Sequence, residues 1–378
     1  MVTFALLKRK LMNASKPRLI AFYLPQFYPI PENDKWWGAG FTEWTNVRKA
    51  RPLFPGHYQP KVPAELGYYD LRSVDVRIKQ AQLAQSAGIE GFCFWHYWFG
   101  GRRLLERVFS EIVSSGIPDF PFCLCWANHS WYKKTWSLSN SRKLLVKQVY
   151  NGEADYSAHF YAMLPAFRDK RYLKVDGKLM FGIFDPVSMP DIDIFRSVWN
   201  ELARKNGLNG FYFFACSSPK CTSILIEKGY DAVVEDYLYA GIDRHTTFWQ
   251  LLNKIRTNVF KRPYVESYDE YVKLALDNYN PAVNVHQSIY PNFDHSPRSG
   301  TRGRILHGSN PDKWGGFCDK IFEKSSVRDH EHNIIFIKAW NEWGEGNYLE
   351  PDRKFGRGYL DKTLQALVNF DCKTSTGF

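Results

Sequence analysis

The sequence contains no run of about 18 uninterrupted apolar residues, which excludes a helix that spans a membrane. Its first 18 residues hold only a short apolar stretch, broken by Lys8, Arg9 and Lys10, and no signal-peptide cleavage site. We therefore expect a cytoplasmic protein. Peripheral contact of this basic, mildly apolar start with the inner membrane surface stays open as an alternative.

Metal-binding and disulfide patterns are also missing. The seven cysteines are odd in number, scattered, and mostly inside apolar runs, which favours free thiols in a reducing compartment. Cys123 and Cys125 have no matching second pair, so we expect no zinc site, and nothing else in the sequence calls for a metal or cofactor. The one Asp-x-Asp pair, Asp191 and Asp193, follows a proline and is typical of a helix N-terminus rather than of a nucleotide-metal site.

What the chain does have is a large aromatic content and excess positive charge. Hydrophobic residues make up 44% and charged residues 24% of 378 residues, so the chain can bury a full core. Phe, Trp and Tyr reach 17%, more than packing usually needs, and sugar rings commonly stack on such side chains. The net charge of +11 favours anionic partners, such as phosphates, acidic glycans or an anionic membrane. Nucleic acid has only this charge and the aromatics in its favour, and we do not expect it as a partner.

Eight short apolar runs alternate with eight amphipathic stretches, which indicates βαβ units and a parallel sheet. We therefore predict an α/β fold, a single (β/α)₈ TIM barrel over residues 18–372, after a basic tail over residues 1–17. A doubly wound sheet is the second choice, but it usually has a Gly-rich turn after the first strand, where this chain has "LPQFYP". The predicted strands are 18–24, 89–98, 120–127, 178–185, 210–217, 230–237, 282–290 and 333–340. The predicted helices are 73–87, 104–115, 154–172, 191–206, 220–228, 269–279, 310–325 and 359–370.

Two connections are unusually long, 25–72 and 238–268. Long loops after barrel strands usually build or cover the active site, which lies at the carboxyl ends of the strands. We expect both to cover that face.

The eighth predicted strand runs into "WNEWGEG", which places Glu342 and Glu345 at the mouth of the barrel. Gly344 and Gly346 allow a sharp turn there, so both carboxylates can converge. Glycosidic chemistry uses two such groups, an acid for the leaving oxygen and a base or nucleophile at the sugar. The alternative is structural: either carboxylate could bind an arginine or cap a helix.

The other strand ends and the first long loop supply polar and aromatic side chains suited to sugars. Some of these belong to the packed core instead, Arg298 could be solvated, and a lone histidine such as His129 is more often a structural group than a ligand. The residues that we predict to bind substrate are Tyr23, Trp44, His57, Trp95, His96, Tyr97, Trp126, Asn128, Tyr290, Asp294, Arg298, Asn341 and Trp343.

Several long motifs in order make the chain resemble the WbsX-type proteins of bacterial polysaccharide loci, from about residue 18 to about residue 365. They are "AFYLPQFYPIPEND", "PLFPGHYQP", "GFCFWHYWF", "LLERVF", "FPFCLCWAN", "ILHG" and "AWNEWGEGNYLEPD". That group is similar in turn to the endo-α-mannosidases of glycoside hydrolase family 99, through "NEW-EG" and a Tyr-Pro…Asp…Arg segment. The resemblance implies a (β/α)₈ barrel, with Glu342 as base on the sugar's own 2-hydroxyl and Glu345 as acid/base. It also implies retention without a covalent enzyme adduct. Two departures are His129, where WbsX relatives tend to have Glu, and Gly344, where the mannosidases have His.

The expected function is therefore that of an enzyme acting on glycosidic bonds of a bacterial polysaccharide or its lipid-linked oligosaccharide precursor. A glycosyltransferase of polysaccharide biosynthesis remains an alternative, because hydrolysis and transfer differ in the acceptor rather than in the carboxylates. A glycan-binding protein without catalysis is a second alternative.

Overall fold

The computed structural model describes residues 16–134, 142–238, 255–257 and 259–376. Eight parallel strands in this part of the chain pair in order, and the last pairs with the first, so the sheet closes into a barrel. The closed ring confirms the predicted (β/α)₈ barrel and excludes the doubly wound sheet. The strands are β1 (Arg18–Tyr23), β2 (Gly91–His96), β5 (Phe122–Trp126), β9 (Lys178–Ile183), β10 (Phe211–Ser217), β11 (Ala232–Asp236), β13 (Val285–Ile289) and β16 (Ile334–Ile337).

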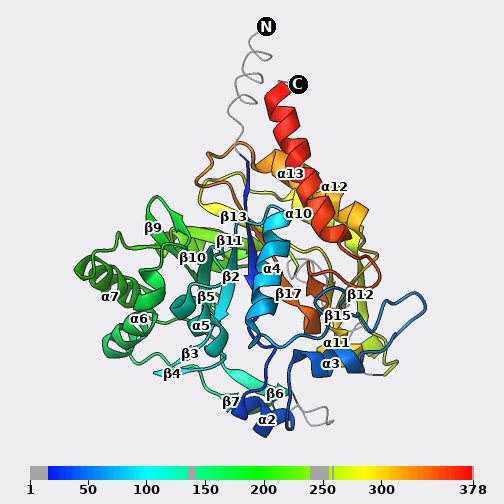
Figure 1. Ribbon diagram of the computed structural model, residues 1–378, viewed down its shortest axis with the longest axis horizontal. Helices are drawn as coiled ribbons and strands as arrows, with labels where there is room; N and C mark the ends of the chain where they lie inside the picture. Colours follow the sequence, from blue (N-terminus) through cyan, green and yellow to red (C-terminus); the bar gives the residue numbers. More distant parts are fainter. Residues whose placement is uncertain (1–15, 135–141, 239–254, 258, 377–378) are drawn as a thin grey trace.

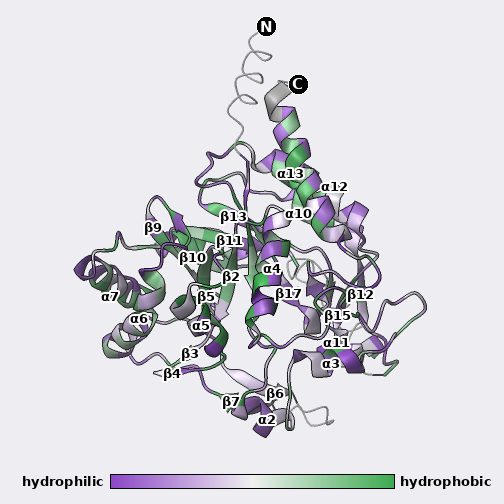
Figure 2. Ribbon diagram, in the orientation of Figure 1, coloured by the Kyte–Doolittle hydropathy of each residue, from purple (hydrophilic) through white to green (hydrophobic). Residues whose placement is uncertain are grey.

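Helices surround the barrel, one after each strand (Figure 1). Figure 2 shows the hydrophobic colour concentrated on the strands, whereas the helices carry both colours. This distribution is expected, because a barrel strand is buried on both faces and an outer helix on one. The helices are α4 (Val74–Ser86), α5 (Arg107–Ser115), α6 (Glu153–Phe167), α7 (Ile192–Lys205), α8 (Thr222–Glu227), α10 (Tyr268–Asp277), α12 (Pro311–Ser325) and α13 (Gly358–Thr376).

The packing of α7 illustrates how the core forms. Phe195 and Trp199 are fully buried, four residues apart on one face of the helix, and their ring centroids are 4.5 Å apart. Trp199 also contacts Phe181 of β9, at 4.6 Å between centroids. Aromatic packing of this kind covers the outer face of the barrel and leaves the strand ends to carry the polar groups.

The long connection 25–72 contains two short helices, α2 (Pro31–Trp37) and α3 (Glu43–Lys49). The connection 238–268 lies mostly outside the described residues, as does most of the predicted tail 1–17. The last part of the connection 238–268 forms β12 (Tyr264–Ser267), which pairs with β15 (Arg304–His307).

The cysteines and the membrane prediction can be compared with the structure directly. None of the seven cysteines, all in the described part of the chain, forms a disulfide, as predicted, although Cys372 is exposed. Among the described helices, none combines the length and the apolar character needed to cross a bilayer.

Candidate active site

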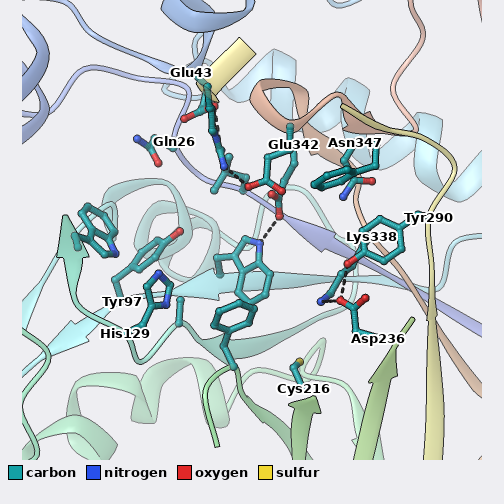
Figure 3. Close-up of a pocket in the computed structure, with 18 of the residues that line it drawn as sticks. Gln26, Glu43, Tyr97, His129, Cys216, Asp236, Tyr290, Lys338, Glu342 and Asn347 are labelled. Atoms are coloured by element: carbon teal, nitrogen blue, oxygen red, sulfur yellow. Dashed lines mark hydrogen bonds and ion pairs between the residues drawn. The ribbon is translucent and has the colours of Figure 1, made fainter. Parts of the chain in front are cut away.

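A cavity of about 440 Å³ lies at the carboxyl ends of the barrel strands (Figure 3). Its volume is within the range of about 300–1,000 Å³ that is typical of small-molecule sites. Each of the eight strands contributes at least one lining residue from its end or from the residues just after it. Examples, in strand order, are Leu24, Trp95, Ala127, Phe184, Cys216, Asp236, Tyr290 and Lys338.

The two predicted glutamates meet in a tight hairpin after β16. It consists of β17 (Asn341–Glu342), the 3-10 turn η4 (Trp343–Glu345) and β18 (Asn347–Tyr348). Asn341 fixes the hairpin to the end of β1, since its side chain accepts from the Leu24 amide at 2.7 Å and donates to the Leu24 carbonyl at 3.0 Å. Glu342 and Glu345 both line the cavity as a result.

The two glycines of the hairpin serve different purposes. Gly346 has φ +52°, a left-handed conformation that favours glycine. Gly344 is needed for space, because a Cβ there would lie 1.9 Å from Oε2 of Glu43 and 2.9 Å from Nε of Arg298. Gly346 therefore serves the turn, as predicted from the sequence. Gly344 leaves room for the ion pair between Glu43 and Arg298.

Glu342 is buried, with 8% of its surface exposed. The indole Nε1 of Trp95 donates a hydrogen bond to its Oε1 at 2.7 Å. Burial, together with the negative charge of Glu345, raises the pKa of Glu342 to about 8, against the opposing effects of Arg298 and Trp95. Glu342 therefore carries a proton at neutral pH.

Glu345 has the opposite environment. Burial alone favours its neutral form, but the adjacent Arg298 and then His295 hold the pKa of Glu345 below its ordinary value. Arg298, on α11 (Ser296–Ser299), forms an ion pair with Glu345 and a second one with Glu43 at 3.0 Å. One glutamate is thus protonated and its neighbour ionised, which is how paired catalytic carboxyls divide acid and base roles.

A second charged group lies on another wall of the cavity. Lys338 Nζ is 2.8 Å from Oδ2 of Asp236, and the Tyr290 hydroxyl donates to the same oxygen at 2.5 Å. Figure 3 shows these three side chains together, with Tyr97 and His129 on the opposite side. Attraction to Asp236 outweighs burial and raises the pKa of Lys338, so this pair is ionised.

Of the thirteen residues predicted to bind substrate, four line this cavity: Trp95, Tyr97, Tyr290 and Arg298. The other nine do not. Four of these nine are core residues whose polar groups are bonded inside the protein. Tyr23 donates to Gln80, Trp44 to the Tyr69 carbonyl, Trp126 to the Trp98 carbonyl, and Trp343 to Glu350.

The remaining five have structural partners. Asn341 holds the hairpin, and Asn128 binds the backbone of Asp185 through both ends of its amide, at 2.7 and 2.8 Å. His96 pairs with His159 behind the barrel wall, at 2.8 Å between their Nε2 atoms. His57 and Asp294 bind each other at 2.7 Å and line a separate cavity of about 100 Å³.

Sequence reasoning missed Lys338, Asp236 and Asn347 as candidate site residues. The first two had a usable signal, because Asp236 ends β11 and Lys338 follows β16 directly, at the face where barrel enzymes keep their sites. Asn347 had none, since its place depends on the pairing of β18 with β17. Within the described part of the chain, no three His, Cys, Asp or Glu side chains are grouped as metal ligands.

Comparison with known proteins places the chain in a family. The family model described as "Glycosyltransferase WbsX" matches residues 19–363. The uncharacterized protein WxcX of Xanthomonas campestris pv. campestris is 35% identical over 360 residues, which are 93% of this chain and 49% of that protein. The chain thus spans about half the length of the curated relatives it matches.

Solved structures share the fold at low sequence identity. A glycoside hydrolase-like protein superposes with a TM-score of 0.57 at 12% identity, covering 94% of this chain and 95% of that one. The GH99 endo-alpha-mannosidase from Bacteroides thetaiotaomicron gives 0.51 at 16% identity, covering 95% and 98%. These likenesses show the barrel fold, and the family model together with the WxcX match shows that this chain belongs to the WbsX family.

Proposed function

We propose that this chain is a carbohydrate-active enzyme that cleaves or transfers at a glycosidic bond through Glu342 and Glu345. The observation that carries the proposal is the pair itself: two carboxyl groups in one cavity whose pKa values are shifted in opposite directions. Trp95 and Tyr97 provide aromatic surface beside them, which suits a sugar ring.

The division of roles follows from the charges around the pair. A general acid must begin protonated, and a general base must begin ionised. We therefore assign the acid role to Glu342 and the base role to Glu345, because Arg298 keeps Glu345 ionised. This assignment is the reverse of the one that the family 99 resemblance implies.

The proposed reaction retains configuration through the sugar's own 2-hydroxyl. Glu342 gives its proton to the leaving oxygen while the 2-hydroxyl gives its proton to Glu345 and bonds to the anomeric carbon. Water or a second sugar then attacks that carbon, Glu342 takes the acceptor's proton, and Glu345 returns a proton to the 2-oxygen. Both carboxyl groups end as they began, and the acceptor decides between hydrolysis and transfer.

The substrate that we propose is a bacterial polysaccharide or its lipid-linked oligosaccharide precursor. The WbsX family and the aromatic cavity wall support a carbohydrate, and the net charge of +11 suits a phosphate-bearing carrier that lies outside the cavity. A glycosyltransferase that uses a nucleotide sugar is the second candidate, favoured by the description of the family model.

The test is an activity screen over bacterial polysaccharides and nucleotide sugars, with products followed by mass spectrometry. Wild type is compared with Glu342→Gln, Glu345→Gln and a control, Glu201→Gln, which changes a half-exposed glutamate on α7. We expect oligosaccharide release by wild type and the control, and none by the two site variants. Elongation of an acceptor only when a nucleotide sugar is present would establish the second candidate, and release by both site variants would exclude the pair.

A further inference from the structure

Lys338, Asp236 and Tyr290 form a fixed group on the cavity wall. Asp236 ends β11, Tyr290 follows β13, and Lys338 follows β16. These three strands are neighbours in the barrel, β11 pairing with β13 and β13 with β16. The sheet therefore holds the three side chains at one position, close to the glutamate hairpin that begins three residues after Lys338 (Figure 3).

The ammonium group of Lys338 has hydrogen-bond donors without acceptors in the described part of the chain. Only 7% of Lys338 is exposed, and the one hydrogen-bond partner of its ammonium group among the described residues is Asp236. The rings of Phe22 and Phe184 lie 5.3 and 5.9 Å from Nζ and offer only their faces. A lysine ammonium has three donors, so two remain without an acceptor, and burying them is unfavourable unless a ligand accepts them.

Asp236 offers an acceptor directly beside these donors. Its Oδ2 accepts from Lys338 and Tyr290, and its Oδ1 accepts from the Leu238 amide at 2.9 Å. An ionised carboxylate has about four acceptor positions, so one is left. A donor next to an acceptor matches two neighbouring hydroxyls of a sugar ring, one accepting from Lys338 and the other donating to Asp236.

Two further polar groups on the wall lack partners. Asn347 is only 2% exposed, lines the cavity, and has no hydrogen bond to its Oδ1. It lies opposite Glu342 in the β17–β18 pair. Ser218, just after β10, also lines the cavity with an unpaired Oγ. Buried polar groups are normally hydrogen-bonded, so unpaired ones in residues that line a cavity favour a ligand with hydroxyls.

The charges of the cavity exclude an anionic group at this position. Four acidic side chains line it, and even with Glu342 protonated the other three outnumber the two basic ones. Those two are already paired, Arg298 with Glu43 and Glu345, and Lys338 with Asp236. A carboxylate or phosphate on the substrate would meet uncompensated negative charge. The positive net charge of the chain does not extend into this cavity.

We infer that Lys338 and Asp236, with Asn347 and Ser218, bind the hydroxyl groups of an uncharged sugar ring beside the glutamate pair, and that Lys338 determines specificity for it. The inference rests on the proposed function, because it names the substrate class of the same cavity. It also confines any phosphate of the substrate to a position outside the cavity.

Binding without turnover tests this inference separately from the reaction. The full chain carrying Glu342→Gln, which keeps the cavity's charge at neutral pH, is titrated by saturation-transfer NMR with matched methyl glycosides and methyl uronides of mannose, glucose and galactose. Lys338→Met is then added, and also Lys338→Met with Asp236→Asn, which leaves no unpaired buried charge. Lys313→Met is the matched control, since Lys313 forms a comparable pair with Asp269 on the exposed surface.

We expect at least one neutral glycoside to bind more tightly than its uronide, and both Lys338 variants to lose about tenfold or more of that affinity. The Lys313 control should bind as before, and thermal unfolding should show all variants folded. Equal or tighter binding of the uronides, unchanged affinity in folded Lys338 variants, or no binding of any glycoside would each overturn the inference. Failure of the polysaccharide screen alone would leave the binding result standing.

Discussion

Replacing Trp95 by Phe should shift the pH dependence of activity, because Trp95 donates the hydrogen bond that stabilises the ionised form of Glu342. In the wild type the pKa of Glu342 is raised to about 8, mainly by burial and secondarily by Glu345. An acid with that pKa loses its proton as the pH rises through about 8. If Glu342 is the general acid, kcat/KM should fall on the alkaline side with a limb near pH 8.

The size of the shift follows from the lost bond. The Trp95 Nε1 to Glu342 Oε1 distance is 2.7 Å, and Glu342 is 8% exposed, so the bond is short and well shielded from water. A hydrogen bond to a charged group contributes about 1.5–3 kcal/mol, which equals about 1–2 pKa units. Phenylalanine keeps an aromatic ring but has no N–H donor, so the pKa of Glu342 rises further. The alkaline limb should move upward by about one unit or more.

The assay is kcat/KM against pH for wild type, Trp95→Phe and Trp131→Phe, on the substrate that the screen identifies. Trp131 also lines the cavity but has no hydrogen bond to Glu342, so its variant should leave the limb in place. A limb near pH 4 to 5, the ordinary range of a carboxyl group, or a downward shift in Trp95→Phe would refute the reasoning. Activity that rises through pH 8 would instead make Glu342 the base and restore the roles implied by the family 99 resemblance.

Three further predictions concern the groups around the pair. Gly344→Ala should abolish activity, because the new Cβ would displace Glu43 and Arg298. Activity is measured as product release at saturating substrate. The control Gly316→Ala should be active, because no atom lies within 4 Å of the Cβ that it adds. Arg298→Met should lower the free energy of unfolding in urea by about 3 kcal/mol, since it leaves the buried Glu43 and the partly buried Glu345 without their cation. The loss should be larger at pH 8 than at pH 5, and an equal loss at both pH values would contradict this. Burial raises the pKa of Glu350 to about 7 from 4.5, so this group binds more protons in the native state in that interval and should contribute a fall in stability from pH 4.5 to 7. Glu350→Gln should remove up to about 3 kcal/mol of that fall. If the free energy of unfolding changed equally between pH 4.5 and 7 in the variant and the wild type, the prediction would be contradicted.

The fold was accessible from the sequence because the barrel strands are buried on both faces. A run such as residues 210–217 is almost continuously apolar, and the eight runs are spaced by helical stretches. These patterns are local, and the closure of the sheet follows from their number. The predicted boundaries exceed the observed ones by one to three residues at several strand ends, since apolar loop residues pack against the barrel as well.

The site was only partly accessible, and the residues at the end of β2 and just after it show why. In "WHYW", Trp95 and Tyr97 line the cavity, whereas His96 and Trp98 face α6, with the Trp98 indole donating to Asp155 at 3.0 Å. The two-residue alternation of a strand sorts these four correctly. Applied to the same prediction, it would have kept Trp95 and Tyr97 and removed His96.

Other placements depend on contacts that no local pattern contains. His57 and Asp294 are 237 residues apart, and their pairing places both outside the main cavity. Glu43 reaches the site through Arg298, 255 residues away. Such pairs become visible only when the loops after different strands are brought to one face.

Phe22 connects the interior of the barrel to Glu342 through Trp95. Its ring is fully buried in β1 and stacks on Trp95, with centroids 4.6 Å apart and an interplanar angle of 27°, and it contacts Phe336 of β16 as well. The indole that tunes Glu342 is therefore seated on a hydrophobic residue that no substrate touches. If the proposed acid role of Glu342 holds, substitutions that repack this part of the core should shift the pH optimum of activity. Variants for acidic or alkaline conditions are then best sought beneath the cavity floor.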